Sequence, residues 1–169
     1  WRVDGLVGAG GQAAVWRAHR DADGQLAAIK VAHVAGPDLA ARFAEEAAVL
    51  AAIGAPAVAA VFAHGLLPDR RAFVAMELLD GPTLGDRLAA TPGQLALDEV
   101  LAWLRGIAGA LAAVHDAGFV HRDLKPENLV RDRGGAVRLL DLGLAQRMRG
   151  PADGTVGLVV GTPLYMAPE

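Results

Sequence analysis

The first part of the chain consists of short segments that are rich in apolar residues and bounded by turns, a pattern typical of β-strands. Three strands are predicted, at residues 3–7, 13–19 and 25–31. A glycine-rich turn at residues 8–11 and an aspartate-containing turn at 21–24 separate them. The chain is therefore expected to begin with strands that short turns connect as hairpins.

A helix is predicted next, because apolar residues then recur every three or four positions. Pro37-Asp38 is the start signal, and Gly54 ends the pattern. The apolar positions between them are Leu39, Phe43, Ala47, Leu50 and Ile53. Two further apolar strands, near residues 58–63 and 72–76, complete a small antiparallel sheet.

The second half of the chain is predicted to be mainly helical. A short helix is expected at residues 83–90 and a longer one at 98–117, with Asp98 as the N-cap of the longer helix and Gly118 at its end.

Composition narrows the classes of function. The net charge of −3 argues against a nucleic-acid surface, which needs basic residues gathered on one face. The sequence has no cysteine, so disulfides and thiolate metal sites are excluded, and it has no run of about 18 apolar residues or visible secretory leader. It also has no serine, which leaves four threonines as the aliphatic hydroxyl groups: Thr83, Thr91, Thr155 and Thr162.

The most informative segment is His121-Arg122-Asp123-Leu124-Lys125-Pro126-Glu127-Asn128. It places a carboxylate, an ammonium group and an amide at fixed spacing on one short loop. A charged surface turn would explain any one of these residues alone, but it does not explain the whole string in this order.

This octet resembles the catalytic loop of eukaryotic-like bacterial serine/threonine protein kinases, and the resemblance extends from residue 3 to the end of the chain. It implies an α+β, bilobal protein-kinase fold. The predicted parts are an N-terminal lobe at residues 1–76 with a small antiparallel sheet and one helix, a hinge at 77–82, and the first part of a mainly helical lobe at 83–169.

The resemblance also implies catalytic roles. Asp123 would accept the proton of a substrate hydroxyl, and Lys125 would neutralise charge on the phosphoryl group in transfer. Lys30, in Ala27-Ala28-Ile29-Lys30, would contact the nucleotide phosphates and pair with a glutamate of the following helix. Glu46 is chosen over Glu45, because the family tends to place this glutamate just before a small residue.

The implied cofactors are ATP and Mg²⁺. Asn128 and Asp141, the latter in Leu139-Leu140-Asp141-Leu142-Gly143, are the expected metal ligands, and Leu142 stands where the family has phenylalanine. A glycine-rich loop would hold the phosphates, although Ala13 replaces its third glycine. The expected nucleotide-binding residues are Gly8, Ala9, Gly10, Gly11, Val15, Ala28, Lys30, Met76, Glu77, Leu79 and Val130.

Two threonines fall in the expected activation segment. Arg122 beside Asp123 suggests activation by a phosphorylated loop residue, because a guanidinium group can bind phosphate with two hydrogen bonds. Thr155 is the candidate phosphorylation site. Thr162, in the segment that ends at Ala167-Pro168-Glu169, is expected to contact the catalytic aspartate and line the acceptor pocket. His121 is expected to be a packing residue.

The partners implied are protein substrates, ATP and a second copy of the chain as a homodimer for autophosphorylation, with no nucleic acid and no membrane segment in this chain. The implied location is the cytoplasm, either free or as the cytoplasmic domain of a membrane-anchored kinase. In this family more helices follow the Ala-Pro-Glu motif, so the resemblance predicts a kinase domain truncated at that point.

Two alternatives remain at this stage. The first is a pseudokinase that binds nucleotide or a partner without transferring phosphate, a reading that Ala13 and Leu142 keep open. The second is a fragment that does not fold alone, because truncation exposes apolar surface that later helices cover. The isolated 169 residues are expected to have low or absent activity.

Overall fold

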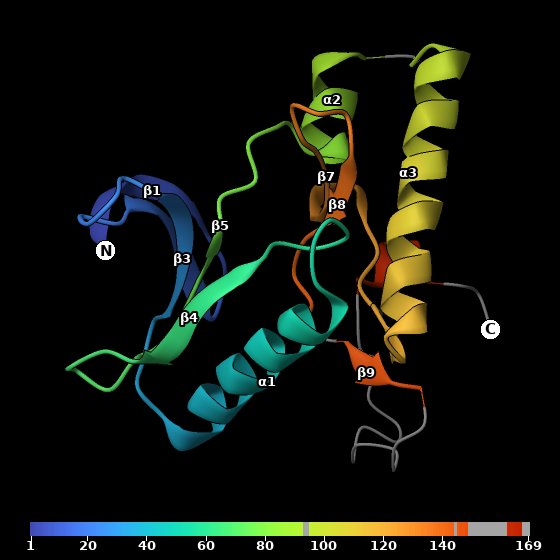
Figure 1. Cartoon of the computed structure of the whole chain (residues 1–169). Helices are drawn as coiled ribbons and strands as arrows, with labels where there is room; N and C mark the ends of the chain where they lie inside the picture. The colour runs from blue at the N-terminus through green and yellow to red at the C-terminus, as the bar shows by residue number, and fades with distance from the viewer. Residues whose placement is uncertain (93–94, 144, 149–161, 167–169) are drawn as a thin grey trace. The chain divides into compact units, whose positions relative to one another are not determined.

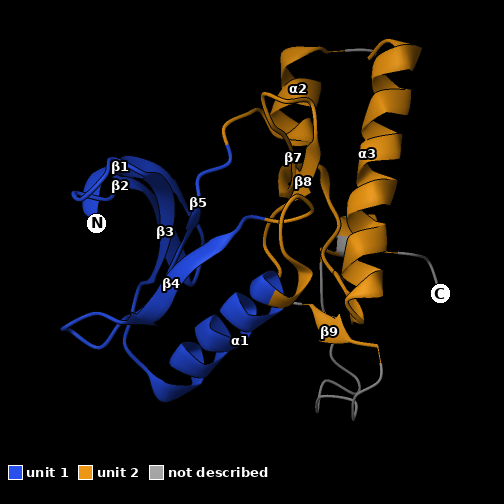
Figure 2. Cartoon of the chain, in the orientation of Figure 1, with its two compact units in different colours: residues 1–51, 59–79 blue, residues 52–58, 80–169 orange. Residues whose placement is uncertain are grey.

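The computed structural model describes residues 1–92, 95–143, 145–148 and 162–166. The chain divides into two compact units (Figure 2). The first consists of residues 1–51 and 59–79, and the second of residues 52–58 and 80–169. The chain therefore passes from one unit to the other after residues 51, 58 and 79. We call residues 52–58 the crossing segment.

The first unit is a five-stranded antiparallel sheet with one helix (Figure 1). Its strands are paired in the order β1-β2-β3-β5-β4, so the last two lie in the reverse of their chain order. The strands are β1 (Arg2–Ala9), β2 (Ala13–His19), β3 (Leu26–Ala32), β4 (Val61–Leu66) and β5 (Ala72–Glu77).

Helix α1 (Pro37–Ile53) packs its apolar side against one face of this sheet. Proline suits the first helical turn because the missing N–H would have no partner there. Gly54 ends the helix with a φ of 73°, a value that glycine adopts without strain. The shared core consists of Phe43 and Ala47 from the helix with Ala13, Ala32, Ala72 and Val74 from the strands.

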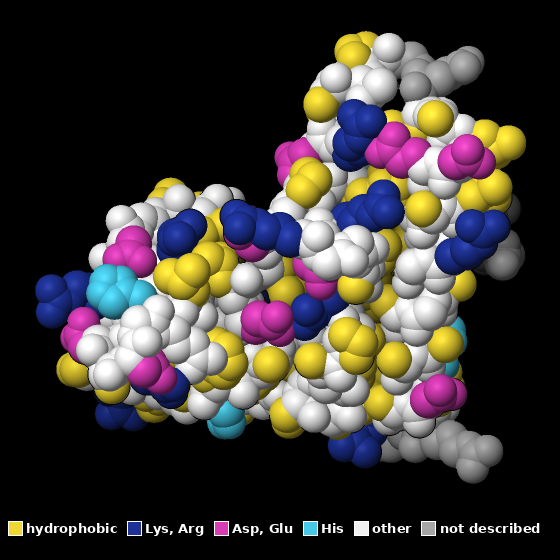
Figure 3. Space-filling view, turned by 45° about the horizontal axis from the view of Figure 1, so that its top comes forward, with side chains coloured by type: hydrophobic (Ala, Val, Ile, Leu, Met, Phe, Trp, Pro, Cys, Tyr) yellow, Lys and Arg dark blue, Asp and Glu magenta, His cyan; other side chains and the backbone are white. Residues whose placement is uncertain are grey.

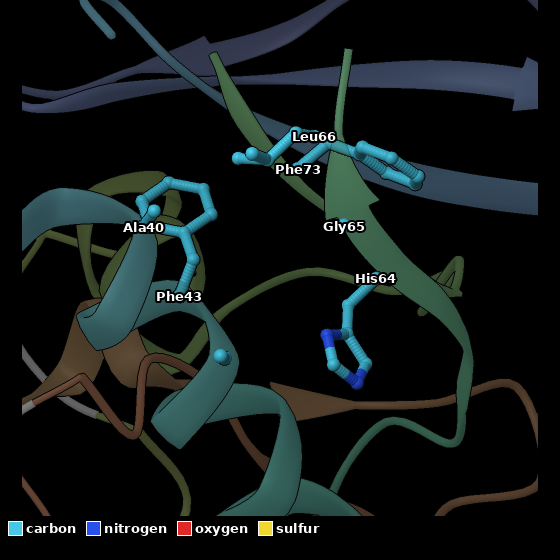
Figure 4. Close-up of a pocket in the computed structure, with 7 residues that line it drawn as sticks. Ala40, Phe43, His64, Gly65, Leu66 and Phe73 are labelled. Atoms are coloured by element: carbon cyan, nitrogen blue, oxygen red, sulfur yellow. The ribbon is translucent and has the colours of Figure 1, made fainter. Parts of the chain in front are cut away.

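A small hollow of about 140 Å³ lies beside this core, between α1 and strands β4 and β5 (Figure 4). Phe43, His64 and Phe73 contribute its rings. None of the predicted site residues lines it.

The described part of the second unit contains helices α2 and α3 and two pairs of short strands. Helix α2 (Leu84–Ala90) begins with a capping box, in which Thr83 and Asp86 each accept a hydrogen bond from the other's backbone N–H. Helix α3 (Leu97–Asp116) follows, and Gly118, with a φ of 83°, comes just after its end. The short strands pair as β6 (Phe119–Val120) with β9 (Gln146–Arg147) and β7 (Leu129–Arg131) with β8 (Val137–Leu139).

Strand β8 is the central element of the second unit. On one side it pairs with β7, and on another Leu139 forms a parallel bridge to Val58 of the crossing segment. The buried guanidinium group of Arg138 donates to the carbonyl oxygen of Val58 at 2.7 Å, and its Nη1 lies 3.6 Å from Asp132. Gly106 of α3 packs so closely on β8 that a Cβ there would overlap the side chain of Val137.

The predicted α+β class is confirmed, and the predicted start and end of α1 agree with the structure. Other boundaries differ. Strand β4 begins at Val61 rather than near Val58, because Val58 pairs with β8 instead. Strand β1 extends to Ala9, so the turn consists of residues 10–12.

The predicted cap of α3 was wrong. Its N-cap is Ala96, which makes no side-chain hydrogen bond, and Asp98 lies in the first turn. A carboxylate in the first turn still suits the positive end of the helix dipole. Asp98 therefore marks the start of the helix, although it lies two residues after the N-cap.

Within the described part of the chain, no helix combines the length and the apolar character needed to cross a membrane.

Candidate functional site

Several predicted nucleotide-binding residues of the first unit lie on one face of its sheet. Gly8 is opposite Val15, and Val15 is opposite Lys30, so the three residues share a face. Ala28 is two residues before Lys30 and therefore lies on the same face, with Met76 directly opposite it. Antiparallel pairing thus brings together residues that are up to 68 positions apart in the sequence.

Lys30 forms an ion pair with Glu46. Its Nζ atom lies 2.7 Å and 2.8 Å from the two carboxylate oxygens, and the glutamate is only 6% exposed. The Lys30 ammonium also lies 5.7 Å from the ring centroid of Phe43, within the range of a cation–π contact. Glu45 is exposed. The helix therefore turns Glu46, and not its neighbour, toward the strand that carries the lysine.

The glycines before β2 are not required by the fold. A Cβ on Gly8 or Gly11 would meet no atom within 4 Å, and on Gly10 the nearest would be the carbonyl oxygen of Ala13 at 3.9 Å. None of the three has a positive φ. Small residues here therefore leave the backbone open to a ligand without serving the packing, as a phosphate-binding turn requires.

The other residues predicted to contact adenine are Glu77, Leu79 and Val130. Glu77 ends β5, where its carboxylate accepts a hydrogen bond from the backbone N–H of Ala60 at 3.2 Å, and Leu79 follows two residues later. Val130 is 3% exposed in β7 of the second unit and bridges to Thr83.

The octet of the second unit folds into a compact hydrogen-bonded loop around Asp123. This carboxylate is 7% exposed. Lys125 Nζ donates to its Oδ2 at 2.7 Å, the Thr162 hydroxyl donates to its Oδ1 at 2.6 Å, and Asn128 Nδ2 donates to its Oδ2 at 3.1 Å. Three different side chains thus converge on one acid.

These contacts determine the charge of the acid. Burial raises the pKa of Asp123, but the hydrogen bonds from Lys125, Thr162 and Asn128, with the positive charge of Lys125, lower it by more. The pKa therefore lies below its ordinary value, and Asp123 is an ionised acceptor at neutral pH. The same hydrogen bond raises the pKa of Lys125, which stays an ammonium.

His121 connects this loop to the backbone at Leu140. Its ring is 2% exposed, with Nε2 3.0 Å from the carbonyl oxygen of Leu140 and Nδ1 3.3 Å from the backbone nitrogen of Asp123. The carbonyl requires a donor and the backbone N–H an acceptor, so Nε2 carries the proton and Nδ1 is bare. Burial lowers the pKa of His121, which agrees with this neutral form.

The two predicted metal ligands offer oxygen atoms. Asn128 Nδ2 donates to the carbonyl oxygen of Asp123 at 2.8 Å, an orientation that leaves the amide oxygen as the atom able to bind a cation. The Asn128 carbonyl in turn accepts from the backbone N–H of Leu140, the residue before Asp141. A carboxylate and an amide oxygen suit Mg²⁺, which usually takes its remaining ligands from phosphates and water.

Backbone strain marks the same region. Arg122 and Asp141 have φ values of 66° and 55°, in the left-handed region that non-glycine residues rarely adopt. Such strain persists only where the surroundings impose it, and it concentrates at functional sites. Leu142, beside Asp141, is 2% exposed and fills an apolar position.

An open hollow of about 220 Å³ lies beside Asp123. Its walls come from Arg122, Asp123, Leu124, Thr162, Tyr165 and Met166. Lys125 Nζ lies 3.2 Å from the Thr162 hydroxyl, so the ammonium group and the Asp123 carboxylate both contact the same hydroxyl group. The candidate phosphorylation site, Thr155, lies outside the described residues.

Two residues of interest were not predicted. Arg138 is 5% exposed and holds the crossing segment, and His33 contacts the glycine-rich turn. Neither follows a periodic pattern that would have signalled its contacts. Lys30 and Lys125, by contrast, are the only lysines of the sequence, and both were predicted.

Comparison with known proteins agrees with the motifs. The protein kinase domain family model matches residues 1–169. The chain is 39% identical to serine/threonine-protein kinase pkn2 of Myxococcus xanthus over 178 residues, which cover the whole chain and 21% of that protein. It is 34% identical to serine/threonine-protein kinase PknA of Mycobacterium tuberculosis over 176 residues, which cover the whole chain and 41% of that protein.

A third relative, serine/threonine-protein kinase PknL of Mycobacterium bovis, is 36% identical over 170 residues, which cover 99% of the chain and 42% of that protein. The chain therefore spans less than half the length of these relatives. The kinase resemblance that was inferred from the octet and from Lys30 is confirmed, because the family model matches residues 1–169. The chain belongs to the protein kinase domain family.

Proposed function

We propose that this chain is the catalytic part of a bacterial serine/threonine protein kinase, which transfers the γ-phosphoryl group of ATP to a hydroxyl group of a protein. The relatives carry the name serine/threonine-protein kinase, which supports the class of reaction. The observation that carries the proposal is the hydrogen bond of 2.6 Å from the Thr162 hydroxyl to the ionised carboxylate of Asp123. An acid that holds the chain's own hydroxyl is chemically suited to hold a substrate hydroxyl.

Each residue of the proposed site has one task. Asp123 orients the acceptor hydroxyl and takes its proton, while Lys125, 2.7 Å from Asp123, stabilises the charge that develops nearby. Lys30, held by Glu46, binds the phosphates, and the turn around Gly8–Gly11 covers them with backbone N–H groups. Val15, Ala28, Met76 and Val130 would contact the adenine ring, and the backbone from Glu77 to Leu79 its polar edge.

Asn128 and Asp141 would hold Mg²⁺. When bound, Mg²⁺ would neutralise negative charge on the phosphates of ATP, which is the phosphoryl donor. The donor set fits the ion because both side chains offer hard oxygen atoms. The lobe boundaries of residues 1–76, 77–82 and 83–169 belong to the same proposal.

Regulation by phosphorylation is also proposed. Arg122 adjoins the acid and lines the hollow beside it, so a phosphorylated threonine bound by its guanidinium group would order the activation segment. Thr155 is the proposed site, and a homodimer would allow one copy to phosphorylate the other. The proposed location is the cytoplasm, free or as part of a membrane-anchored protein.

The proposal is tested by phosphate transfer from radiolabelled ATP and Mg²⁺ to a basic acceptor protein, with the full-length protein. Asp123→Asn is expected to lower kcat by about 10²-fold or more, the usual contribution of a positioned base. Phosphopeptide analysis is expected to find phosphate on Thr155 in the wild type and none in this variant. Asp98→Asn, which removes an exposed carboxylate of α3, is the matched control and should keep its activity.

Equal activity of the two aspartate variants would contradict the proposed role of Asp123. A wild-type protein that binds ATP and transfers no phosphate would instead indicate a pseudokinase.

A further inference from the structure

A histidine outside the predicted site holds the tip of the glycine-rich turn. The Nε2 atom of His33 lies 2.8 Å from the carbonyl oxygen of Gly10, and the backbone N–H of His33 donates to the carbonyl oxygen of Gln12 at 3.0 Å. Because a carbonyl oxygen only accepts, Nε2 carries the proton in this contact. One residue therefore binds the turn on both sides of Gly11.

The turn needs such support because of its composition. Gly10 and Gly11 have no side chains to pack, and Gly10, Gly11 and Gln12 are all exposed. A further hydrogen bond, from the N–H of Gly10 to the carbonyl oxygen of Ala13 at 2.9 Å, closes the hairpin but does not restrain the Gly10 carbonyl. Glycine loses more conformational freedom on ordering than any other residue, so a side-chain contact here has a large effect on the turn.

His33 is well placed to couple the turn to the proposed phosphate-binding lysine. It directly follows β3, and Lys30 lies three residues earlier, within that strand. The pairing of Ala13 with Ala32 brings the end of β3 beside the start of β2. The position of the turn and the position of Lys30 are therefore set by the same short stretch of backbone.

We infer that His33 is a positioning residue for the nucleotide: it holds the turn of residues 10–12 in one conformation before the nucleotide binds. This inference rests on the proposed function, because it assumes that the turn covers the phosphates. Without the His33 side chain the free turn samples more conformations. Nucleotide binding then has to order the turn, and this entropy cost lowers the affinity. The loss applies equally to the ground state and the transition state, so it raises KM for ATP and leaves kcat almost unchanged.

Three variants test whether the effect depends on a hydrogen-bond donor that reaches the Gly10 carbonyl or only on the size of the side chain. His33→Ala removes the donor, while the backbone bond to Gln12 stays. His33→Gln places an amide N–H where Nε2 was, and His33→Asn carries the same amide on a chain too short to reach Gly10. His115→Ala, at an exposed position of α3, is the control for loss of a histidine.

The affinity for a fluorescent ATP analogue, KM for ATP and the hydrogen exchange of the amides of residues 9–13 are measured in the full-length protein. His33→Ala and His33→Asn are expected to weaken nucleotide binding and raise KM by about three- to tenfold, the effect of one hydrogen bond. Exchange of the turn without nucleotide should accelerate in both. His33→Gln should restore all three values toward those of the wild type.

Three outcomes would overturn the inference: unchanged affinity and exchange in His33→Ala, tighter binding in that variant, or equal behaviour of the Gln and Asn variants. Failure of the proposed function is recognised separately. In that case the wild type transfers no phosphate, whether or not it binds nucleotide, and the exchange measurement still reports whether His33 holds the turn.

Discussion

At the scale of single residues, the ion pair of Lys30 and Glu46 links stability to the proposed activity. Glu46 is 6% exposed, so removal of the lysine leaves a buried carboxylate without its partner. Lys30→Met is expected to lower the free energy of unfolding by about 3 kcal/mol. The double variant Lys30→Met with Glu46→Gln should recover most of this loss, since the uncompensated charge is gone.

Urea unfolding measures both variants, and phosphate transfer should be lost in both. The exposed pair of Asp69 and Arg71, at a similar distance of 2.7 Å, is the control: Asp69→Asn should leave the stability almost unchanged. A double variant as unstable as Lys30→Met alone would contradict the explanation by a buried charge.

His121 predicts a dependence of stability on pH. Burial lowers its pKa below the ordinary value of 6.5, so the unfolded chain takes up a proton at a higher pH than the folded one. The stability that comes from neutral His121 is complete above about pH 6.5 and is lost as the pH falls toward the lower pKa of the folded state. Protonation of Nδ1 would also abolish its hydrogen bond with the backbone N–H of Asp123.

The free energy of unfolding is therefore expected to decrease as the pH falls from about 6.5 to about 5.5. His121→Gln should decrease less over this range, whereas His115→Gln, at an exposed position, should follow the wild type. Equal slopes for wild type and His121→Gln would show that His121 does not titrate in this way.

At the scale of elements, two glycines of α3 predict opposite effects. A Cβ on Gly106 would overlap Val137 of β8, while a Cβ on Gly109 would meet no atom within 4 Å. Gly106→Ala is expected to cost about 1–3 kcal/mol through overpacking. Gly109→Ala should stabilise the protein by about 0.5–1 kcal/mol, because alanine is the better helix former. Thermal unfolding of both variants checks this, and a loss of stability in both would contradict it.

The sequence predicts elements with strong local signals. Pro37 and Gly54 bound α1, and its apolar spacing identifies the face that carries Glu46. The start of β4 could not be predicted, because an apolar run does not show whether Val58 pairs with β5 or with β8. The two- and three-residue strands β6 to β9 are too short to display a period.

The same reasoning applies to the candidate site. Asp123, Lys125 and Asn128 are close in sequence, so their spacing alone places them in one loop. The contacts of Arg138 with Val58 and of His33 with Gly10 join residues 80 and 23 positions apart. Such contacts depend on tertiary structure, and no local pattern encodes them.

At the scale of the whole molecule, the crossing segment predicts that the two units unfold together. Helix α1 begins in the first unit and ends in the second, and Arg138 and Leu139 bind the residues that follow it. Arg138→Met removes the charged hydrogen bond to Val58 and is expected to cost about 1.5–3 kcal/mol. Hydrogen exchange should then show the same loss of protection in β2 and in α3.

Faster exchange confined to α3 and β8 would contradict joint unfolding. Arg138→Lys, which keeps a positive donor, should lie between the wild type and Arg138→Met.

The surface gives no sign of a strongly basic region on the face in Figure 3, where positive and negative side chains are interspersed. A net charge of −3 agrees with this mixture. The absence of a nucleic-acid partner stays a prediction.

The chain's two lysines have a chemical consequence. Lys30 and Lys125 are each bound to a carboxylate at 2.7 Å, and both are among the residues proposed to surround the transferred phosphate. Acylating reagents need the uncharged amine, so both side chains should react slowly in the folded protein. Within these 169 residues, labelling of side-chain amines therefore reports on the proposed site alone. Bound nucleotide should slow the labelling of Lys30 further.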